Sequence, residues 1–392
     1  MPEKPLDDRI ERFEWRAPEE ELADLRSRLA LARFPERETT NPDASGAKRW
    51  EQGPPLADMV DLVDYWRTAY DWRAFEERLA EIGQFRTRID GLGIHFLHRR
   101  SSRPDATPLV LTHGWPGSVA EFVDVIDALT EPDDPDVPAF HVVAPSLPGF
   151  GFSDKPAEPG WGTERIAAAW AQLMGRLGYD RFLAHGGDWG GPITIALGGR
   201  FSRHVIGIHT TTPVAPPGLG LDVLDDTERQ WVAHTRGFER NRLAYAKVMA
   251  TSPQTIGYSL ADSPVGLLAW ILEKFFEWSD TADSPFETIS RDRILDNVTL
   301  YWLTATGASA SRIYFESHQS LDPDLRVDVP AALTTYPHDI EKHPRPWAEE
   351  RFRRIVRWRA PEAGGHFPAL EMPDAFVVDL REGLAAVMAA VT

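Results

Sequence analysis

The segment Gly186-Gly187-Asp188-Trp189-Gly190 has the residue types and the spacing of a nucleophile elbow. It follows a short apolar run and precedes a helical stretch, and small residues at such a junction permit a strained strand-to-helix turn that projects the central side chain into a pocket. Because the central carboxylate of Asp188 is already ionised, it attacks an electrophile directly and forms an ester, which suits displacement at a tetrahedral carbon. The structural alternative is an ordinary turn in which Asp188 caps the following helix.

A second candidate segment, residues 113–118 (HGWPGS), comes directly after the first strong apolar run. In folds with a nucleophile elbow, the loop after this strand supplies one backbone N–H of the oxyanion hole, and the residue after the nucleophile supplies the other. Trp115 and Trp189 hold those positions. Taken alone, the segment is also an ordinary turn of Gly and Pro, so its place before the elbow is what favours the catalytic interpretation.

A histidine near the end of the chain completes the pattern of a hydrolytic triad. His366 stands in GGHFP, after the last apolar run, and is the last of the twelve histidines. The triad order in such folds is nucleophile, acid, histidine. The acid is therefore expected after the preceding strand, where Asp339 is the first candidate and Glu341 the near competitor. His338 and His343 are five residues apart and would lie on different helix faces, so we predict no metal site there.

The elements that must position these residues alternate between strands and helices. Residues 18–32 and 55–82 carry apolar side chains at helical spacing, and no strand is expected before about residue 85. The next segment resembles a hairpin that turns at Gly91 or Gly93. Short apolar runs then alternate with helical stretches, which predicts an α/β fold with a mostly parallel sheet flanked by helices.

The strand pattern is interrupted once. From residue 215 to 324 the chain is rich in Trp and Leu at helical spacing; strands return at 329–337 and 354–361, and a helix is expected at 374–390. We therefore predict four segments: an N-terminal helical extension (1–84), the first part of an α/β-hydrolase core (85–214), an inserted helical cap (215–324) and the second part of the core (325–392).

Composition narrows the classes of function. The 392 residues include 60 acidic and 42 basic side chains, a formal charge of −18, and no cysteine. This excludes disulfides and thiolate metal sites and disfavours nucleic acid as a partner. No secretory signal, membrane anchor or apolar span is evident, so a soluble, cytoplasmic protein is expected. No phosphate-binding or metalloprotease motif is present, and no cofactor or metal is predicted.

Taken together, the motifs resemble the microsomal-type epoxide hydrolases of the α/β-hydrolase superfamily, a branch that includes the juvenile hormone epoxide hydrolases. The likeness extends over nearly the whole chain, through DYWRTAYDWR, GIHFLH, HGWPGS, GGDWGG, TIGYSLADSPVGLLAWILEKF and GGHFPALE. The resemblance implies that Asp188 is the nucleophile, His366 the general base and Asp339 the acid that orients it. The hydrophobic anchor of the mammalian members is not found at this N-terminus.

The resemblance also implies two cap tyrosines that donate protons to the epoxide oxygen. Local motifs match Tyr245 and Tyr314, whereas the other cap tyrosines, Tyr258 and Tyr301, are expected to pack. The family reaction converts an epoxide and water to a vicinal diol, and a haloalkane dehalogenase with the same Asp nucleophile is the alternative. A non-catalytic ligand-binding protein is a further alternative, which the complete set of motifs disfavours. The possibility of a homodimer is left open.

A group of cap aromatic residues bears on the substrate. They suggest a hydrophobic epoxide, although most of them are expected to belong to the core: Trp231, Trp270, Phe275, Phe276 and Trp278.

Overall fold

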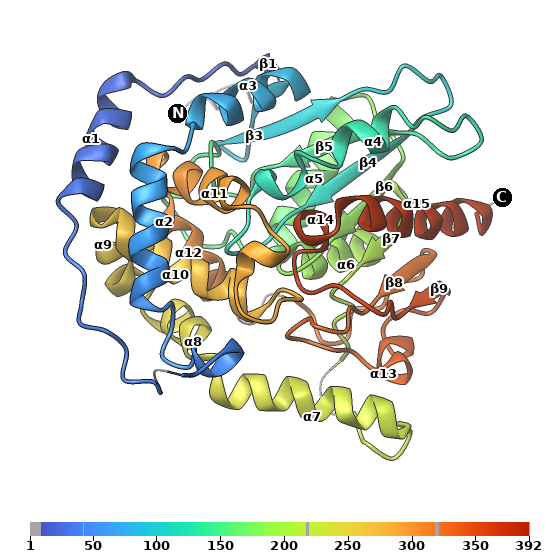
Figure 1. Ribbon diagram of the computed structural model, residues 1–392. Helices are drawn as coiled ribbons and strands as arrows, with labels where there is room; N and C mark the ends of the chain where they lie inside the picture. Colours follow the sequence, from blue (N-terminus) through green and yellow to red (C-terminus); the bar gives the residue numbers. More distant parts are fainter. Residues whose placement is uncertain (1–8, 42, 217–218, 318–320, 392) are drawn as a thin grey trace.

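The structure is a computed structural model and is shown in Figure 1. It describes residues 9–41, 43–216, 219–317 and 321–391. A few residues of the predicted segments lie outside the described residues, namely 1–8 and 42 of the extension, 217–218 and 318–320 of the cap, and 392 of the core.

A nine-stranded sheet forms the centre of the described structure, in the order β1-β2-β3-β5-β4-β6-β7-β8-β9. The pairs β1–β2, β2–β3 and β3–β5 are antiparallel. The remaining neighbours in the sheet are parallel, namely β5–β4, β4–β6, β6–β7, β7–β8 and β8–β9. The predicted α/β fold with a mostly parallel sheet is confirmed. The strands are β1 (Glu11–Arg12), β2 (Gln84–Ile89), β3 (Leu92–Arg99), β4 (Thr107–Thr112), β5 (Phe140–Pro145), β6 (Phe182–Gly186), β7 (Val205–Thr210), β8 (Ala331–Thr334) and β9 (Ile355–Arg359).

Both faces of the sheet are buried, which explains the short apolar runs in the sequence. Within β4, Leu109 and Leu111 face one core while Val110 faces the other. Helices α4 (Ile126–Thr130) and α15 (Pro373–Ala389) cover the first face, and α5 (Thr163–Arg176) and α6 (Gly190–Arg200) cover the second. A strand covered on both sides needs apolar residues in succession, and burying each such side chain contributes about 1.5–3 kcal/mol.

The prediction that no strand precedes residue 85 is wrong. Strand β1 pairs antiparallel with β2, with Glu11 opposite Arg86 and Arg12 opposite Phe85. Both β1 side chains are exposed, and two residues are too few to show an alternating pattern. Its pairing is determined by the free edge of β2, which the local sequence does not reveal.

The predicted helical stretch at 55–82 forms two helices, α2 (Leu56–Thr68) and α3 (Trp72–Ile82). The break is at Asp71, whose side chain accepts a hydrogen bond from the backbone N–H of Arg73 and so caps α3. With α1 (Glu19–Ala30), these helices lie beside helices of the predicted cap in Figure 1. Trp66 Nε1 donates to Thr299 Oγ1 at 2.9 Å, and this buried hydrogen bond ties α2 to a later helix.

Among the residues that the structure describes, six α-helices lie between β7 and β8 along the chain, coloured yellow to orange in Figure 1. They occupy the segment predicted as a cap, and the limits 215–324, like those of the other segments, remain a prediction. The helices are α7 (Asp226–Asn241), α8 (Ala244–Thr251), α9 (Pro253–Asp262), α10 (Pro264–Glu277), α11 (Arg291–Leu303) and α12 (Gly307–Ser317). Shorter elements are η1 (Gly46–Lys48), η2 (Val119–Phe122), η3 (Pro285–Glu287), α13 (Arg345–Glu349) and α14 (Pro368–Glu371).

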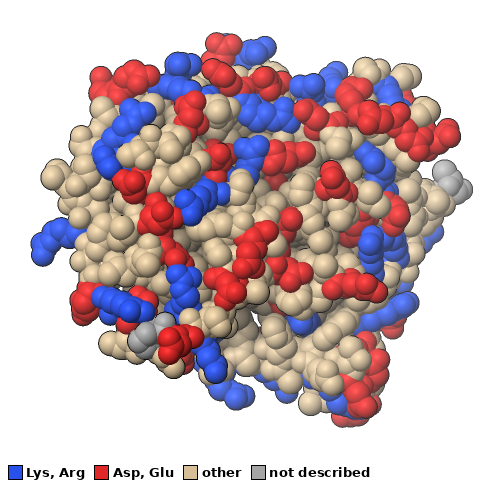
Figure 2. Space-filling model, in the orientation of Figure 1, with Lys and Arg blue, Asp and Glu red and all other residues tan. Residues whose placement is uncertain are grey.

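On the face drawn in Figure 2, acidic and basic side chains are interspersed. Across the described ranges, no single helix combines the length and the apolar character needed to cross a membrane; α9 and α10 meet that criterion only as a pair, bent by 118°.

Candidate active site

The turn between β6 and α6 has the strained geometry expected of an elbow. Asp188 adopts a φ of 50°, in the left-handed region that a non-glycine residue seldom occupies. A Cβ atom on Gly186 would lie 2.1 Å from the carbonyl oxygen of Gly190, and one on Gly190 would lie 2.1 Å from that of Thr112. The flanking glycines are therefore required by close backbone contacts, and the turn presents the Asp188 side chain to the interior.

Two backbone N–H groups hold one oxygen of this carboxylate. Asp188 Oδ1 accepts hydrogen bonds from the N–H of Trp115 at 2.8 Å and from the N–H of Trp189 at 2.7 Å. A Cβ atom on Gly114 would lie 2.0 Å from Oδ1, so a glycine is needed where the loop passes the carboxylate. These are the two N–H groups predicted for the oxyanion hole, and they leave the other carboxylate oxygen, Oδ2, for other contacts.

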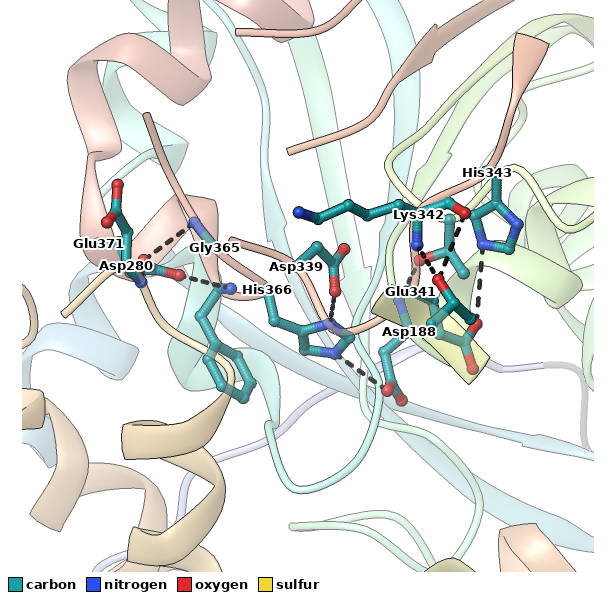
Figure 3. Close-up of polar contacts among 12 residues, drawn as sticks. Asp188, Asp280, Asp339, Glu341, Lys342, His343, Gly365, His366 and Glu371 are labelled. Carbon is teal, nitrogen blue, oxygen red and sulfur yellow. Dashed lines mark hydrogen bonds and ion pairs between the residues drawn. The ribbon is translucent and has the colours of Figure 1, made fainter. Parts of the chain in front are cut away.

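Figure 3 shows His366 between two carboxylates. Its Nε2 lies 3.1 Å from Asp188 Oδ2, and its Nδ1 lies 2.7 Å from Asp339 Oδ1. Asp339 comes from the loop after β8, and His366 comes from the loop between β9 and α14. The three residues therefore meet at the carboxyl ends of the strands, in the predicted order along the chain.

The structure also distinguishes the two candidate acids. The carboxylate of Glu341 lies 3.7 Å from His343 Nε2, and no hydrogen bond joins it to His366 in the described part of the chain. Asp339 is the residue within hydrogen-bond distance of the imidazole. Strand β8 ends at Thr334 rather than at residue 337, so Asp339 follows it by five residues instead of the two expected.

The charge of His366 depends on its two carboxylate neighbours. Burial lowers its pKa, but the charges of Asp339 and Asp188 and their hydrogen bonds outweigh that effect and raise the pKa well above 6.5. The two carboxylates therefore favour the charged form of the ring in the free protein. If Asp188 lost its charge, one of the causes that raise this pKa would disappear.

The loop that carries His366 is fixed by contacts that the sequence analysis did not identify. The carboxylate of Glu371 accepts hydrogen bonds from the N–H of Gly365 at 3.1 Å and of Phe367 at 2.8 Å. The N–H of His366 donates to the carbonyl of Trp278 at 2.7 Å, and the Trp278 ring packs edge-on against the imidazole. The position of Glu371, five residues after the histidine in GGHFPALE, was the available signal.

The two predicted cap tyrosines lie over the loops that hold Asp188. Tyr245, in α8, stacks on Trp115 with ring centroids 5.4 Å apart, and Tyr314, in α12, packs edge-on against Trp189 at 4.9 Å. Both are buried. Burial raises the pKa of each phenol well above 10, and the charge of Asp188 adds to this effect. Both hydroxyls therefore keep their protons at neutral pH.

The remaining cap tyrosines behave differently from each other. Tyr301 is buried and its hydroxyl donates to the carbonyl of Gly117 at 2.8 Å, so the expectation that it packs is confirmed. For Tyr258 the same expectation is wrong, because its side chain stands on the outer face of α9 and is 71% exposed. Neither lines the cavity that contains Asp188.

A cavity of about 230 Å³ lies between the core and the cap helices. Most of its lining is apolar, with a small number of polar groups that include Asp188 and His366, which is the pattern of a small-molecule site. The aromatic cap residues Phe275, Phe276 and Trp278 are buried, as expected of core residues, and do not line it. The lining residues are Asp188, Trp189, Pro192, Thr212, Val214, Leu243, Tyr245, Tyr314, Asp339, Ile340, Glu341 and His366.

Comparison with known proteins places the chain in a family. Residues 10–122 match the family model described as "Epoxide hydrolase N terminus", and residues 107–248 match "alpha/beta hydrolase fold". A relative from Stigmatella aurantiaca that carries an epoxide hydrolase name is 46% identical over 378 residues, covering 94% of this chain and 83% of that protein. The chain belongs to the epoxide hydrolase family.

Solved structures agree with the assignment of this chain to the epoxide hydrolase family. The juvenile hormone epoxide hydrolase of the silkworm Bombyx mori superposes with a TM-score of 0.92 at 29% identity, over 100% of this chain and 97% of that one. The Aspergillus niger epoxide hydrolase gives a TM-score of 0.86 at 33% identity, over 97% of each chain. The family assignment therefore favours the epoxide hydrolase interpretation over the haloalkane dehalogenase alternative.

Proposed function

We propose that this epoxide hydrolase converts small hydrophobic epoxides to vicinal diols through a covalent ester on Asp188. One observation carries the proposal. Both backbone N–H groups bind Oδ1 of Asp188, while Oδ2 lies beside His366 in a cavity that two protonated tyrosines also line. The carboxylate therefore has one oxygen held where negative charge will develop and one oxygen available to attack.

In the first step, Asp188 Oδ2 attacks one epoxide carbon, and the bond from that carbon to the ring oxygen breaks. Tyr245 and Tyr314 hydrogen-bond to the ring oxygen, and one of them gives it a proton. A phenol whose pKa is above 10 still donates readily, because the alkoxide that forms is far more basic. The product of this step is a hydroxyalkyl ester of Asp188.

In the second step, water hydrolyses that ester. Ester formation removes the charge of Asp188, which is one of the causes that raise the pKa of His366. The ring then gives up its proton, which restores the phenol that donated in the first step, and the neutral imidazole is available as a base. It takes a proton from water as the water oxygen bonds to Asp188 Cγ. The oxyanion forms on Oδ1 between the N–H groups of Trp115 and Trp189, where the loss of one donor typically costs roughly 3–4 kcal/mol.

Collapse of this intermediate breaks the bond between Cγ and Oδ2. The diol leaves with Oδ2 and the proton from His366, and the proton that remains on the Asp188 carboxyl passes to His366, which restores the starting state. Asp339 keeps the ring oriented through Nδ1. The apolar lining of the 230 Å³ cavity supports a hydrophobic epoxide of modest size. A second cavity of about 410 Å³, which shares Val214 and Glu341 with the first, supports entry beside α7.

The experiment that tests this proposal traps the ester. We expect His366→Ala to accumulate a styrene oxide adduct on the peptide that contains Asp188, detected by mass spectrometry, because alkylation proceeds and hydrolysis does not. The same variant carrying Asp188→Asn is the control and should show no adduct. Absence of an adduct in His366→Ala, together with halide release from a haloalkane by the parent protein, would contradict the proposal.

A further inference from the structure

A third and much smaller cavity, distinct from the two described above, adjoins Asp188 and His366 within the core. Within the described ranges, it shares the lining residues Asp188 and His366 with the substrate cavity, and no others. Its other walls come from η2, β6, α14 and α15 and the loops beside them. The space open to water is about 20 Å³, and one buried water molecule needs roughly 10–15 Å³. The cavity therefore has room for a single water molecule beside the reacting pair.

The polar side chains around this space favour a water molecule over a dry void. Glu121 and His185 line it together with Asp188 and His366. His185 Nδ1 lies 2.9 Å from Nδ1 of the buried His209, which leaves the other ring nitrogen of His185 for a further contact. Cavities that hold water are polar and offer it two to four partners, whereas empty cavities are apolar.

Glu121 is a carboxyl group without a partner. Among the described residues nothing donates a hydrogen bond to its side chain. A Cβ atom on Gly117 would lie 1.5 Å from Glu121 Oε1, so a glycine in the HGWPGS loop makes room for this carboxyl. Burial raises the pKa of Glu121 to about 8, and the charge of Asp188 adds to this effect. Glu121 is half-buried and its carboxyl lines this cavity, and an ordered water molecule is the usual partner of such a group.

We propose that this cavity holds the water molecule that hydrolyses the Asp188 ester, and that Glu121 positions it by hydrogen bonding. The inference rests on the proposed function and assigns the second step to a site apart from the substrate. His366 takes a proton from the water, whose oxygen bonds to Cγ of Asp188. Glu121 exchanges no proton in this step. Alkylation of Asp188 therefore does not depend on Glu121, whereas hydrolysis of the ester does.

The test measures the two steps separately. In single turnovers with styrene oxide, rapid quenching and mass spectrometry follow the alkylated Asp188 peptide as it forms and decays. Glu121→Ala should slow the decay by about 10- to 100-fold, the effect of a misplaced reactant, while the adduct forms at the parent rate. Glu121→Gln, which keeps a hydrogen-bonding group at the same place, should recover part of the decay rate.

A second variant displaces the proposed water molecule without changing a polar side chain. Ala369 also lines the cavity and is buried, so Ala369→Val fills the space and should slow decay of the ester in the same way as Glu121→Ala. Asp127→Asn is the matched control, because this half-exposed carboxylate pairs with Arg78 and does not line the cavity; both of its rates should equal those of the parent.

Two results would overturn the inference. In the first, the ester in Glu121→Ala and Ala369→Val decays at the parent rate. In the second, formation and decay of the ester fall by the same factor, which is the signature of a general structural defect. If neither the parent nor His366→Ala forms any adduct, the proposed function fails, and the inference fails with it. Normal alkylation combined with unaffected decay overturns the inference and leaves the proposed function standing.

Discussion

The contact between Asp339 and His366 yields a quantitative prediction for Asp339→Asn. The substitution keeps the shape of the side chain and removes a charge whose oxygen lies 2.7 Å from Nδ1 of the imidazole. With about 4 Å between charge centres and an effective dielectric constant of about 20, the interaction is about 4 kcal/mol. Loss of this interaction lowers the pKa of His366, because the charge of Asp339 is the largest of the causes that raise it.

The sign of the effect follows from which form of His366 is active. Hydrolysis of the ester requires the neutral ring, and Asp339 favours the charged ring, so its removal lets the neutral ring persist to lower pH. We therefore expect the acidic limb of the rate of ester hydrolysis to move to lower pH. The plateau should fall by roughly 10³- to 10⁴-fold, because a less basic ring without its orienting partner is a poorer base.

The assay follows formation and decay of the Asp188 ester between about pH 5 and pH 9, the range in which histidine titrates. Glu341→Gln is the matched control. This carboxyl, two residues away, borders the substrate cavity and makes no hydrogen bond to His366 among the described residues, so its effect on ester decay should be much smaller. An unmoved acidic limb in Asp339→Asn, or a larger loss in Glu341→Gln, would refute the assignment of the acid.

Three further predictions concern the tyrosines, a buried histidine and the elbow. Joint replacement of Tyr245 and Tyr314 by Phe should slow alkylation by roughly 10²- to 10⁴-fold, and undiminished diol production would contradict their role. Burial lowers the pKa of His95 to about 3, whereas its pKa in the unfolded chain is about 6.5. Below that pH the unfolded chain binds more protons than the folded protein, so the free energy of unfolding falls, by about 2–3 kcal/mol at pH 4.5. Urea unfolding at two pH values should show that His95→Gln removes this loss; an unchanged pH dependence would refute it. In Gly190→Ala the new Cβ would lie 2.1 Å from the Thr112 carbonyl, so thermal unfolding should show a lower Tm, and an unchanged Tm would count against the packing argument.

The catalytic segments could be predicted from the sequence because their geometry is local. The elbow around Asp188 and the loop that carries Trp115 are short motifs in which glycine spacing determines the backbone. His366 was identified by its place after the last strand. The choice between Asp339 and Glu341 needed the structure, because two carboxylates so close in sequence differ only in where the folded loop directs them.

Other features depend on contacts between segments distant in the chain. Strand β1 is held by the edge of β2, and its own two residues carry no pattern. Glu371 binds backbone groups next to His366 and also the N–H of Asp280, in the cap segment. Glu121 becomes notable only because the chain folds its carboxyl into a cavity with Asp188 and His366. Local spacing contains none of this information.

The central claim, an ester between the substrate and Asp188, is tested most directly by one turnover in ¹⁸O-labelled water with the enzyme in excess over the epoxide. If Oδ2 of Asp188 attacks the epoxide and water then attacks Cγ, the first diol carries no label, and the peptide that contains Asp188 gains it. Mass spectrometry of both products decides the question. Label in the first diol, with an unlabelled Asp188 peptide, would show that water opens the epoxide directly and would contradict the account.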